Sequence, residues 1–223
     1  MKVDAVIVAA GSSTRFGAED KLFADLCGRP VVAWSLAAYA AAKHIDHIHL
    51  VCAPDNIDRM EALGHEWAPD RFVAAIPGGA RRRDSVEAGL RAGASRYVAI
   101  HDGARPLIPP ALIDQCIEVA QHGNGAIVAT PVTDTIKLVS GTMITGHPDR
   151  SLLWAAQTPQ VVLRQAWLRA ASMGDNDETD DAAMLSRLGL ECAIVPGDPH
   201  NLKITHPLDL ETARLILQSR VQA

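Results

Sequence analysis

The chain has 223 residues, of which 48% are hydrophobic, and its formal net charge is −5. Charged residues interrupt every apolar stretch, so no run approaches the ~20 apolar residues that a membrane-spanning helix needs, and no membrane partner is expected. Basic residues are spread along the chain apart from Arg81-Arg82-Arg83, which argues against a general nucleic-acid-binding surface.

The first residues begin a strand at once. Residues 3–9 are apolar apart from Asp4 and rich in valine, and they leave no room for the basic region and apolar core of a signal peptide. The four cysteines are scattered without a Cys-x-x-Cys spacing, which indicates buried free thiols rather than disulfides or a zinc site. We therefore expect a cytoplasmic protein.

Short β-branched runs alternate with helical patterns along the first 130 residues. Strands are predicted at residues 3–9, 48–52, 72–76, 97–101 and 126–130. Helices are predicted at residues 30–42, 56–63, 82–92 and 110–122. This alternation predicts an α/β fold, with a mainly parallel Rossmann-like sheet covered by helices on both faces.

The rhythm changes after Thr130, where residues 135–139 and 143–145 flank Ser140-Gly141-Thr142. This pattern predicts a β-hairpin with a tight glycine turn. Two strands are not stable alone, so we expect this projecting arm, at about residues 132–152, to pack on the parent sheet or on a partner chain in a homodimer.

The rest of the chain returns to alternating elements. Helices are predicted at residues 163–172, 180–188 and 208–218, and a short strand at 192–195. The acidic residues 175–181 could suggest a metal site, but Asn176, Asp177 and Thr179-Asp180 before an apolar helix are typical of a helix start. Residues 1–223 are therefore expected to form a single domain with a hairpin arm.

The loop from Ala9 to Lys21 leaves the first strand and is dense in small residues. At the carboxyl end of a central strand, its exposed amides can hold phosphate oxygens, and Arg15 and Lys21 add positive charge. Its spacing fits neither G-x-G-x-x-G nor the Walker motif. An ordinary glycine-rich surface turn is the alternative interpretation.

Asp102 follows the apolar run of residues 97–100, so it should lie at the same edge of the sheet as this loop. A carboxylate among phosphate groups suits magnesium, because Mg²⁺ takes one or two protein carboxylates and completes its shell with water and phosphate oxygens. A helix-capping or turn aspartate is the alternative.

Seven ordered motifs resemble the 2-C-methyl-D-erythritol 4-phosphate cytidylyltransferase family of the non-mevalonate isoprenoid pathway, nearly from end to end. They are Ala9-Ala10-Gly11 through Lys21, Gly78-Gly79-Ala80-Arg81 with Asp84-Ser85-Val86, His101-Asp102-Gly103-Ala104-Arg105-Pro106, Asp134-Thr135-Ile136-Lys137, Gln157-Thr158-Pro159-Gln160, Thr179-Asp180-Asp181-Ala182, and Asn201-Leu202-Lys203-Ile204-Thr205.

The resemblance implies a nucleotidyltransferase domain that transfers CMP from CTP to 2-C-methyl-D-erythritol 4-phosphate, with Mg²⁺ as cofactor. The catalytic residues would be Arg15, Lys21 and Asp102, with Asp102 holding the metal. CTP would be bound by Ala9, Ala10, Gly11, Ser12, Ser13, Gly79 and Ser85. The polyol phosphate would be bound by Arg105, Thr135, Arg150, Thr158 and Lys203, with Thr135 and Arg150 reaching it from the arm of a neighbouring subunit.

The mechanism needs no dedicated general base, because a phosphate monoester with a second pKa near ~6 is already an anionic nucleophile at neutral pH. We expect in-line attack on the α-phosphorus, stabilised by Arg15 and Lys21.

Three alternatives stay open at this point. The loop is one residue shorter than the family pattern, and its Asp20-Lys21-Leu22 also resembles guanylyltransferases, so the loop alone does not identify the base. Within the class, the chain could be a ribitol 5-phosphate cytidylyltransferase or another small-molecule nucleotidylyltransferase. In a different class, it could be a non-catalytic nucleotide-sugar-binding module.

Overall fold

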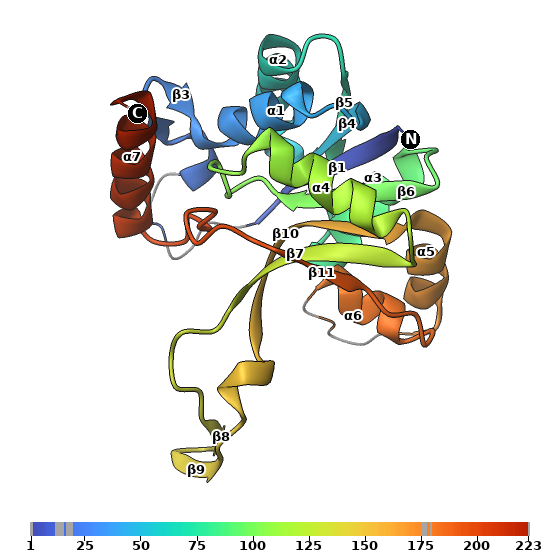
Figure 1. The fold of residues 1–223 in the computed structure, drawn as a ribbon. Helices are drawn as coiled ribbons and strands as arrows, with labels where there is room; N and C mark the ends of the chain where they lie inside the picture. The colour runs from blue at the N-terminus through green and yellow to red at the C-terminus, as the bar shows by residue number, and fades with distance from the viewer. Residues whose placement is uncertain (1, 12–15, 17–19, 175–177, 179, 223) are drawn as a thin grey trace.

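The structure is a computed structural model of the full chain, and it describes residues 2–11, 16, 20–174, 178 and 180–222 (Figure 1). A sheet of seven strands forms its centre, in the order β11-β7-β10-β6-β1-β4-β5. Every neighbouring pair is parallel except the two that involve β10. The strands are β1 (Val3–Ala9), β4 (Ile45–Cys52), β5 (Phe72–Pro77), β6 (Tyr97–Asp102), β7 (Gly125–Pro131), β10 (Trp154–Leu163) and β11 (Ala193–Pro196).

Helices cover both faces of this sheet, as the sequence predicted (Figure 1). They are α1 (Val31–Ala41), α2 (Ile57–Trp67), α3 (Arg82–Ala92), α4 (Pro110–Ala120), α5 (Arg164–Ser172), α6 (Asp181–Ser186) and α7 (Pro207–Gln222). Three short 3₁₀ turns lie at η1 (Lys21–Phe23), η2 (Pro54–Asn56) and η3 (Arg150–Leu152).

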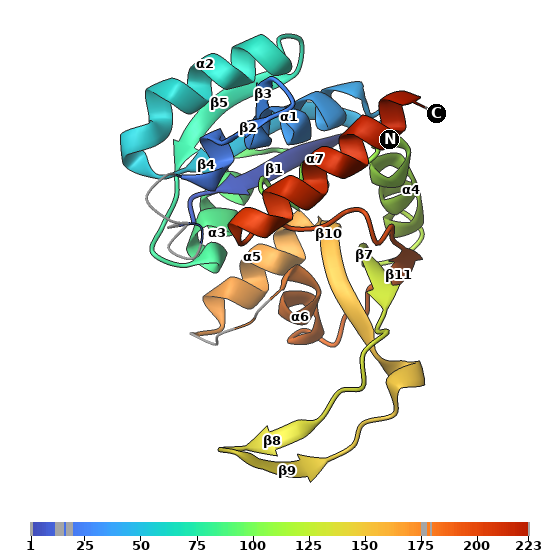
Figure 2. The ribbon, with the colours of Figure 1, turned by 90° about the vertical axis from the view of Figure 1, so that its left-hand side faces the viewer.

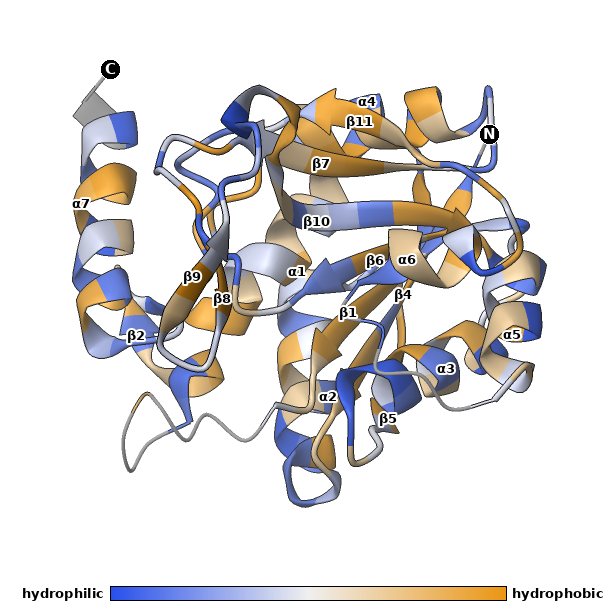
Figure 3. Ribbon diagram, turned by 90° about the horizontal axis from the view of Figure 1, so that it is seen from below, coloured by the Kyte–Doolittle hydropathy of each residue, from blue (hydrophilic) through white to orange (hydrophobic). Residues whose placement is uncertain are grey.

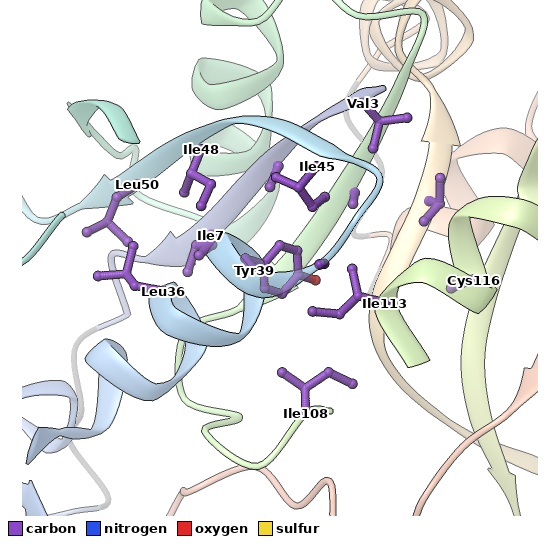
Figure 4. Close-up of a cluster of buried hydrophobic side chains, with 14 of the residues drawn as sticks. Val3, Ile7, Leu36, Tyr39, Ile45, Ile48, Leu50, Ile108, Ile113 and Cys116 are labelled. Atoms are coloured by element: carbon purple, nitrogen blue, oxygen red, sulfur yellow. The ribbon is translucent and has the colours of Figure 1, made fainter. Parts of the chain in front are cut away.

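The alternation of side chains along β1 divides the core in two. Val3 and Ile7 face one side, where α1, α2 and α4 pack over them, and Figure 4 shows this cluster around Tyr39. Val6 faces the other side, where it belongs to a second cluster with side chains of α3, α5 and α6, such as Trp167. Because β1 is apolar on both faces, it has the composition of a central parallel strand.

Strand β10 is the main element that the sequence prediction missed. Its centre is Gln157-Thr158-Pro159-Gln160, which lacks the β-branched, apolar character of a buried strand, and residues 157–162 are nevertheless all buried. It runs antiparallel between β6 and β7. This strand therefore brings polar side chains into the middle of the sheet.

The arm connects β7 to β10 and projects from the body of the protein (Figures 1 and 2). It ends in a two-stranded sheet of β8 (Leu138–Ser140) and β9 (Met143–Gly146), so the hairpin is present but its first strand begins three residues later than predicted. Gly141 has a φ of 57°, which explains a glycine at the turn. Figure 3 shows hydrophobic residues along both strands.

A second, very short hairpin was not predicted. It consists of β2 (Asp25–Leu26) and β3 (Arg29–Pro30), and Cys27 and Gly28 at its turn both have positive φ. Helix α7 lies against it, and a third apolar cluster with Leu26 and Leu217 joins them. Among the described residues, no helix is both long and apolar enough to span a membrane.

Candidate active site

A cavity of about 370 Å³ opens at the carboxyl ends of β1 and β6. It lies where ligands bind in open α/β sheets. The structure brings together in its lining the predicted site residues Ala9, Ala10, Gly11, Lys21, Gly79, Ser85, Asp102 and Lys203. The predicted residues Ser12, Ser13 and Arg15 lie outside the described residues.

The register of two strands explains why the loop and the carboxylate meet. Val8 of β1 pairs with Asp102 of β6, so the chain after Ala9 and the end of β6 leave the sheet at the same level. The amide of Gly103 donates to the carbonyl of Val8 at 2.9 Å, which keeps the two segments together beyond the last strand pair.

Asp102 is the centre of the charges in this cavity. Its Oδ1 accepts from Nε of Arg82 at 3.2 Å, and its Oδ2 accepts from Nζ of Lys203 at 2.8 Å. Burial alone would raise the pKa of this carboxyl, but the charges of Arg82 and Lys203 hold the pKa well below its usual range. The carboxylate is therefore ionised at neutral pH.

Arg82 is held from its other side by Asp181. Nη2 of Arg82 donates to Oδ2 of Asp181 at 2.8 Å, and Trp167 donates its indole hydrogen to Oδ1 at 3.1 Å. The Asp181 side chain is only 1% exposed. Burial alone would lower the pKa of Arg82, but Asp181 and Asp102 keep it above its ordinary value, so this guanidinium stays charged.

Sequence reasoning missed the roles of Arg82 and Asp181. The arginine triplet is noted in the sequence only as a local cluster of charge, and Asp181 only as part of a helix start. The helix start itself is correct for Asp180, whose Oδ1 accepts from the amide of Ala183 at 2.8 Å as an N-cap. The sequence does contain one sign of a second role for Asp181: it is an acidic residue that directly follows Asp180, which already caps the helix.

Thr158 of strand β10 holds the backbone of Asp102 in place through a hydrogen bond. The backbone amide of Asp102 donates to the Thr158 hydroxyl oxygen at 3.1 Å, and that hydroxyl lies 2.9 Å from Nδ1 of His101. Nε2 of His101 faces the carbonyl of Arg105 at 3.2 Å, so Nε2 carries the hydrogen and Nδ1 accepts. Burial lowers the pKa of His101 to about 3, which keeps the ring neutral and this chain of hydrogen bonds intact.

Thr158 is therefore placed beneath the cavity and not in its lining, although the resemblance implies a ligand contact. Arg105 is also mostly enclosed. Its Nη1 donates to the carbonyl of Asn201 at 2.7 Å, and its Nε lies 3.9 Å from Oδ2 of Asp102. Asn201 in turn donates to the carbonyl of Thr158 at 3.0 Å. Arg105 thus adjoins the charged centre without lining the cavity.

The segment after β5 closes the cavity on the side of α3. A Cβ atom on Gly78 would lie 2.5 Å from Cβ of Ala10, and one on Gly79 would lie 2.4 Å from Cβ of Asp84. The amide of Gly79 donates to Oγ of Ser85 at 3.2 Å. Gly78 therefore allows this backbone to approach the first loop closely, and Gly79 allows it to approach the start of α3.

Thr135 and Arg150 lie on the arm, and both are exposed. Nη1 of Arg150 donates to the carbonyl of Thr133 at 2.8 Å. Neither residue lines the cavity of its own chain. Within one chain, the structure does not bring these two predicted residues to the others.

The chain is similar to known proteins over nearly its whole length. Residues 3–219 match the family model described as 2-C-methyl-D-erythritol 4-phosphate cytidylyltransferase. A curated protein of that name from Synechococcus sp. (strain WH7803) is 44% identical over 96% of this chain and 99% of its own length. Another from Syntrophotalea carbinolica is 42% identical over 98% of this chain and 97% of its own.

Solved structures agree with the sequence matches. The 4-diphosphocytidyl-2C-methyl-D-erythritol synthase from Anaerococcus prevotii is similar with a TM-score of 0.85 and 27% identity, over 97% of this chain and 98% of that one. The 2-C-methyl-D-erythritol 4-phosphate cytidylyltransferase from Thermus thermophilus is similar with a TM-score of 0.78 and 28% identity, over 98% of this chain and 100% of that one.

Proposed function

Since the chain belongs to the 2-C-methyl-D-erythritol 4-phosphate cytidylyltransferase family, we propose that the cavity at the ends of β1 and β6 is where it transfers CMP from CTP to 2-C-methyl-D-erythritol 4-phosphate. The products of this enzyme are 4-diphosphocytidyl-2-C-methyl-D-erythritol and pyrophosphate. The observation that carries the assignment to this cavity is its charge pattern. Arg82 and Lys203 contact one ionised carboxylate, that of Asp102, and Lys21 also lines the cavity, beside a loop of small residues.

The reaction joins two phosphate groups, so its main obstacle is negative charge. An oxygen of the polyol phosphate attacks the α-phosphorus of CTP, the new P–O–P bond forms, and pyrophosphate leaves from the opposite side. The attacking oxygen is already anionic at neutral pH and needs no general base. The protein therefore contributes position and positive charge.

Lys21 and Arg15 are proposed to stabilise the charge that builds up on the α-phosphate. Lys21 lines the cavity at the start of η1, where Asp20 caps the turn by accepting from the amide of Leu22 at 3.1 Å. Arg82 adds a third positive charge, fixed between two carboxylates. Groups that are fixed before the substrates arrive lower the barrier because they need no reorganisation during the reaction.

Asp102 is the residue proposed to hold Mg²⁺. It is the one carboxylate in the lining of this cavity among the described residues, and it is ionised. One carboxylate together with substrate phosphates is the donor set that Mg²⁺ prefers, so the site fits the ion. When bound, the metal neutralises phosphate charge and orients the triphosphate.

The polyol phosphate is proposed to bind between two sets of residues. Lys203 from the cavity and Arg105 beside it would come from one subunit, while Thr135 and Arg150 would come from the arm of the partner in a homodimer. The exposed arm supports this proposal, since Leu138, Val139, Met143 and Ile144 are each more than half exposed. Apolar surface of this kind on a projecting hairpin is typical of an interface between chains.

A pyrophosphate-release assay tests the assignment. We expect release with CTP and 2-C-methyl-D-erythritol 4-phosphate, loss of release with EDTA, and recovery on adding excess Mg²⁺. Parallel assays with the other nucleoside triphosphates and with ribitol 5-phosphate should give much lower rates. Preference for ribitol 5-phosphate would overturn the substrate, and no release with any pair would favour the non-catalytic binding module.

Two further expectations remain proposals. We treat residues 1–223 as one nucleotidyltransferase domain whose arm, at about residues 132–152, serves dimerisation. Cytoplasmic localisation stays a prediction from the sequence, which fractionation of cells that express the tagged chain would check.

A further inference from the structure

A second cavity, of about 880 Å³, lies between α1, α7, the β2–β3 hairpin and the segment of residues 106–110. Figure 2 shows α7 lying across β2, β3 and α1 on this side of the molecule. The second cavity shares no lining residue with the first. Its volume is in the range of small-molecule sites, about 300–1,000 Å³.

Hydrogen bonds between its walls indicate that this cavity is preformed. Nε1 of Trp34 donates to the carbonyl of Leu26 at 2.8 Å, which ties α1 to the hairpin. Nη1 of Arg220 donates to the carbonyl of Leu107 at 3.1 Å, which ties α7 to the segment after β6. With its polar atom engaged, Trp34 presents an apolar ring, and Ile108 and Leu217 add aliphatic surface.

One charged residue in this lining, Arg29, is oriented so that it is suited to bind an anion. The guanidinium of Arg29 lies 4.7 Å from the ring centre of Trp34 and 4.5 Å from that of Trp67, so two indoles fix its orientation. Arg29 makes no ion pair with any residue that the structure describes. The other two arginines of the lining differ, because Arg214 pairs with Glu211 at 2.6 Å and Arg220 lies 3.8 Å from Asp198.

We propose that this cavity binds a small molecule with an apolar body and one anionic group, of the class of medium-chain carboxylates. The body would lie on Trp34, Ala37 and Leu217, and the anion would meet Arg29. Charge complementarity selects this class, because Arg29 is the arginine of the lining that has no ion pair with any residue described. A planar guanidinium recognises a carboxylate through two parallel hydrogen bonds.

The four tryptophans allow a direct test on the full chain with octanoate as the probe and octanol as its uncharged match. In ¹⁵N–¹H spectra each indole gives one signal, assigned by Trp→Phe variants. Trp34 reports on the cavity, and Trp154 reports on the start of β10, outside the lining of the cavity. We expect octanoate to shift the Trp34 signal saturably, at concentrations that leave Trp154 unmoved, and octanol to need at least ~10-fold more, as expected when a charge-assisted hydrogen bond worth about 1.5–3 kcal/mol is lost.

Three variants complete the test. Arg29→Met should remove the preference for octanoate over octanol, whereas Arg91→Met, which removes the same charge from the exposed face of α3, should keep it. Ala37→Phe should block both probes by filling the cavity, with thermal unfolding as the check that it folds. Equal affinity for both probes in the unaltered chain, equal shifts of Trp34 and Trp154, or a preference retained by R29M would each overturn the proposal.

Discussion

The cavity of the candidate active site and the arm differ in how their side chains are held. Around the cavity, Asp102 accepts hydrogen bonds from Arg82 and Lys203, and Arg82 in turn donates to the buried Asp181. On the arm, Met143 is 71% exposed and Val139 is 63% exposed, and the hairpin projects away from the body that the structure describes (Figures 1 and 2).

The side-chain contacts around the cavity are complete within one chain, whereas the apolar side chains of the arm are not covered by their own chain. The body fixes its charges before any substrate arrives, because each carboxylate and its cations are held by several strands and helices. The arm exposes apolar surface, whose burial would contribute roughly 25 cal/mol per Å² on assembly. The cavity is therefore built within a chain, whereas Thr135 and Arg150 lie outside its lining and are only proposed to reach the site of a partner.

Lys21 gives the largest expected effect and tests the body alone. Lys21→Ala should lower kcat by about 10²–10³-fold, as loss of one preorganised donor does, with a much smaller rise in KM for CTP. Steady-state pyrophosphate release measures both constants, and Lys43→Ala, an exposed lysine away from the cavity, is the control. An unchanged kcat would remove Lys21 from the mechanism.

Arg150 tests whether the arm acts on the partner's site. Arg150→Ala should lower kcat/KM by about 10–100-fold, the value of one charged hydrogen bond, while the folded body stays intact. Mixing this variant with Lys21→Ala should restore activity, because one site of each mixed dimer then has an unaltered Lys21 and an unaltered Arg150.

The recovered activity has a definite ceiling. If subunits exchange freely, half of the dimers are mixed and each has one complete site, so about a quarter of the normal rate is expected. Recovery is measured after the two variants are unfolded together and refolded. If no activity returns and each dimer still forms, the arm serves its own chain, and the contrast between the two regions disappears.

Asp181 tests how far the bracing of the cavity matters. Asp181→Asn keeps the shape of the side chain but removes the charge that holds Arg82, so we expect kcat to fall about ten-fold, in the range seen when a supporting group of a site is lost. Asp180→Asn is the matched control, since asparagine is an equally good N-cap. A lower melting temperature with unchanged kcat would show that Asp181 serves only the fold.

Substitution of Asp4 is expected to have the smallest effect on activity and a measurable effect on the free energy of unfolding. Its carboxylate lies at the amino end of β1, away from the cavity, and accepts from the amides of Ala94 at 2.8 Å and Ser95 at 2.9 Å. Burial alone would raise the pKa of Asp4, but these hydrogen bonds lower it below its ordinary value. Asp4→Asn should cost about 1–3 kcal/mol of unfolding free energy at pH 7 with kcat unchanged.

The pH dependence of this cost follows from the direction of the shift. A lowered pKa in the folded state stabilises the fold above the unfolded pKa near 3.9, and that contribution is lost as the pH falls through the folded value. The difference between Asp4→Asn and the unaltered chain, measured by urea unfolding, should therefore shrink as the pH falls below about 4. A difference that stays constant down to pH 2.5 would contradict this explanation.

Local pattern was enough to predict most of the sheet. Runs such as residues 3–9 and 97–101 are short and mostly apolar, as in strands that are buried on both faces. Because they alternate with helical patterns, the order of strands and helices could be predicted from the sequence. Strand β10 could not, because its centre carries Gln157, Thr158 and Gln160. Those side chains are acceptable in the core only because distant residues satisfy them, as Asn201 does for Gln157 at 3.0 Å.

The same distinction applies to the candidate site. That Asp102 and Lys21 lie at the same edge of the sheet could be predicted, since each follows a recognisable strand or loop. The contact of Asp181 with the charged centre could not be predicted, because it is made through Arg82, which is 99 residues away in sequence. Thr158 was predicted as a ligand contact, and its place beneath Asp102 depends on the register between β10 and β6, which no local pattern encodes.

Strand β10 also sets where the length of this chain can change. Between Ala156 and Gln160, β10 advances four residues while its neighbour β7 advances two, so a bulge holds Thr158 against His101 and Gln160 against the start of α6. One residue inserted here would turn both side chains to the wrong faces of the sheet. At the tip of the arm, between β8 and β9, an insertion alters no side chain of the body, so natural and engineered length variation should concentrate there.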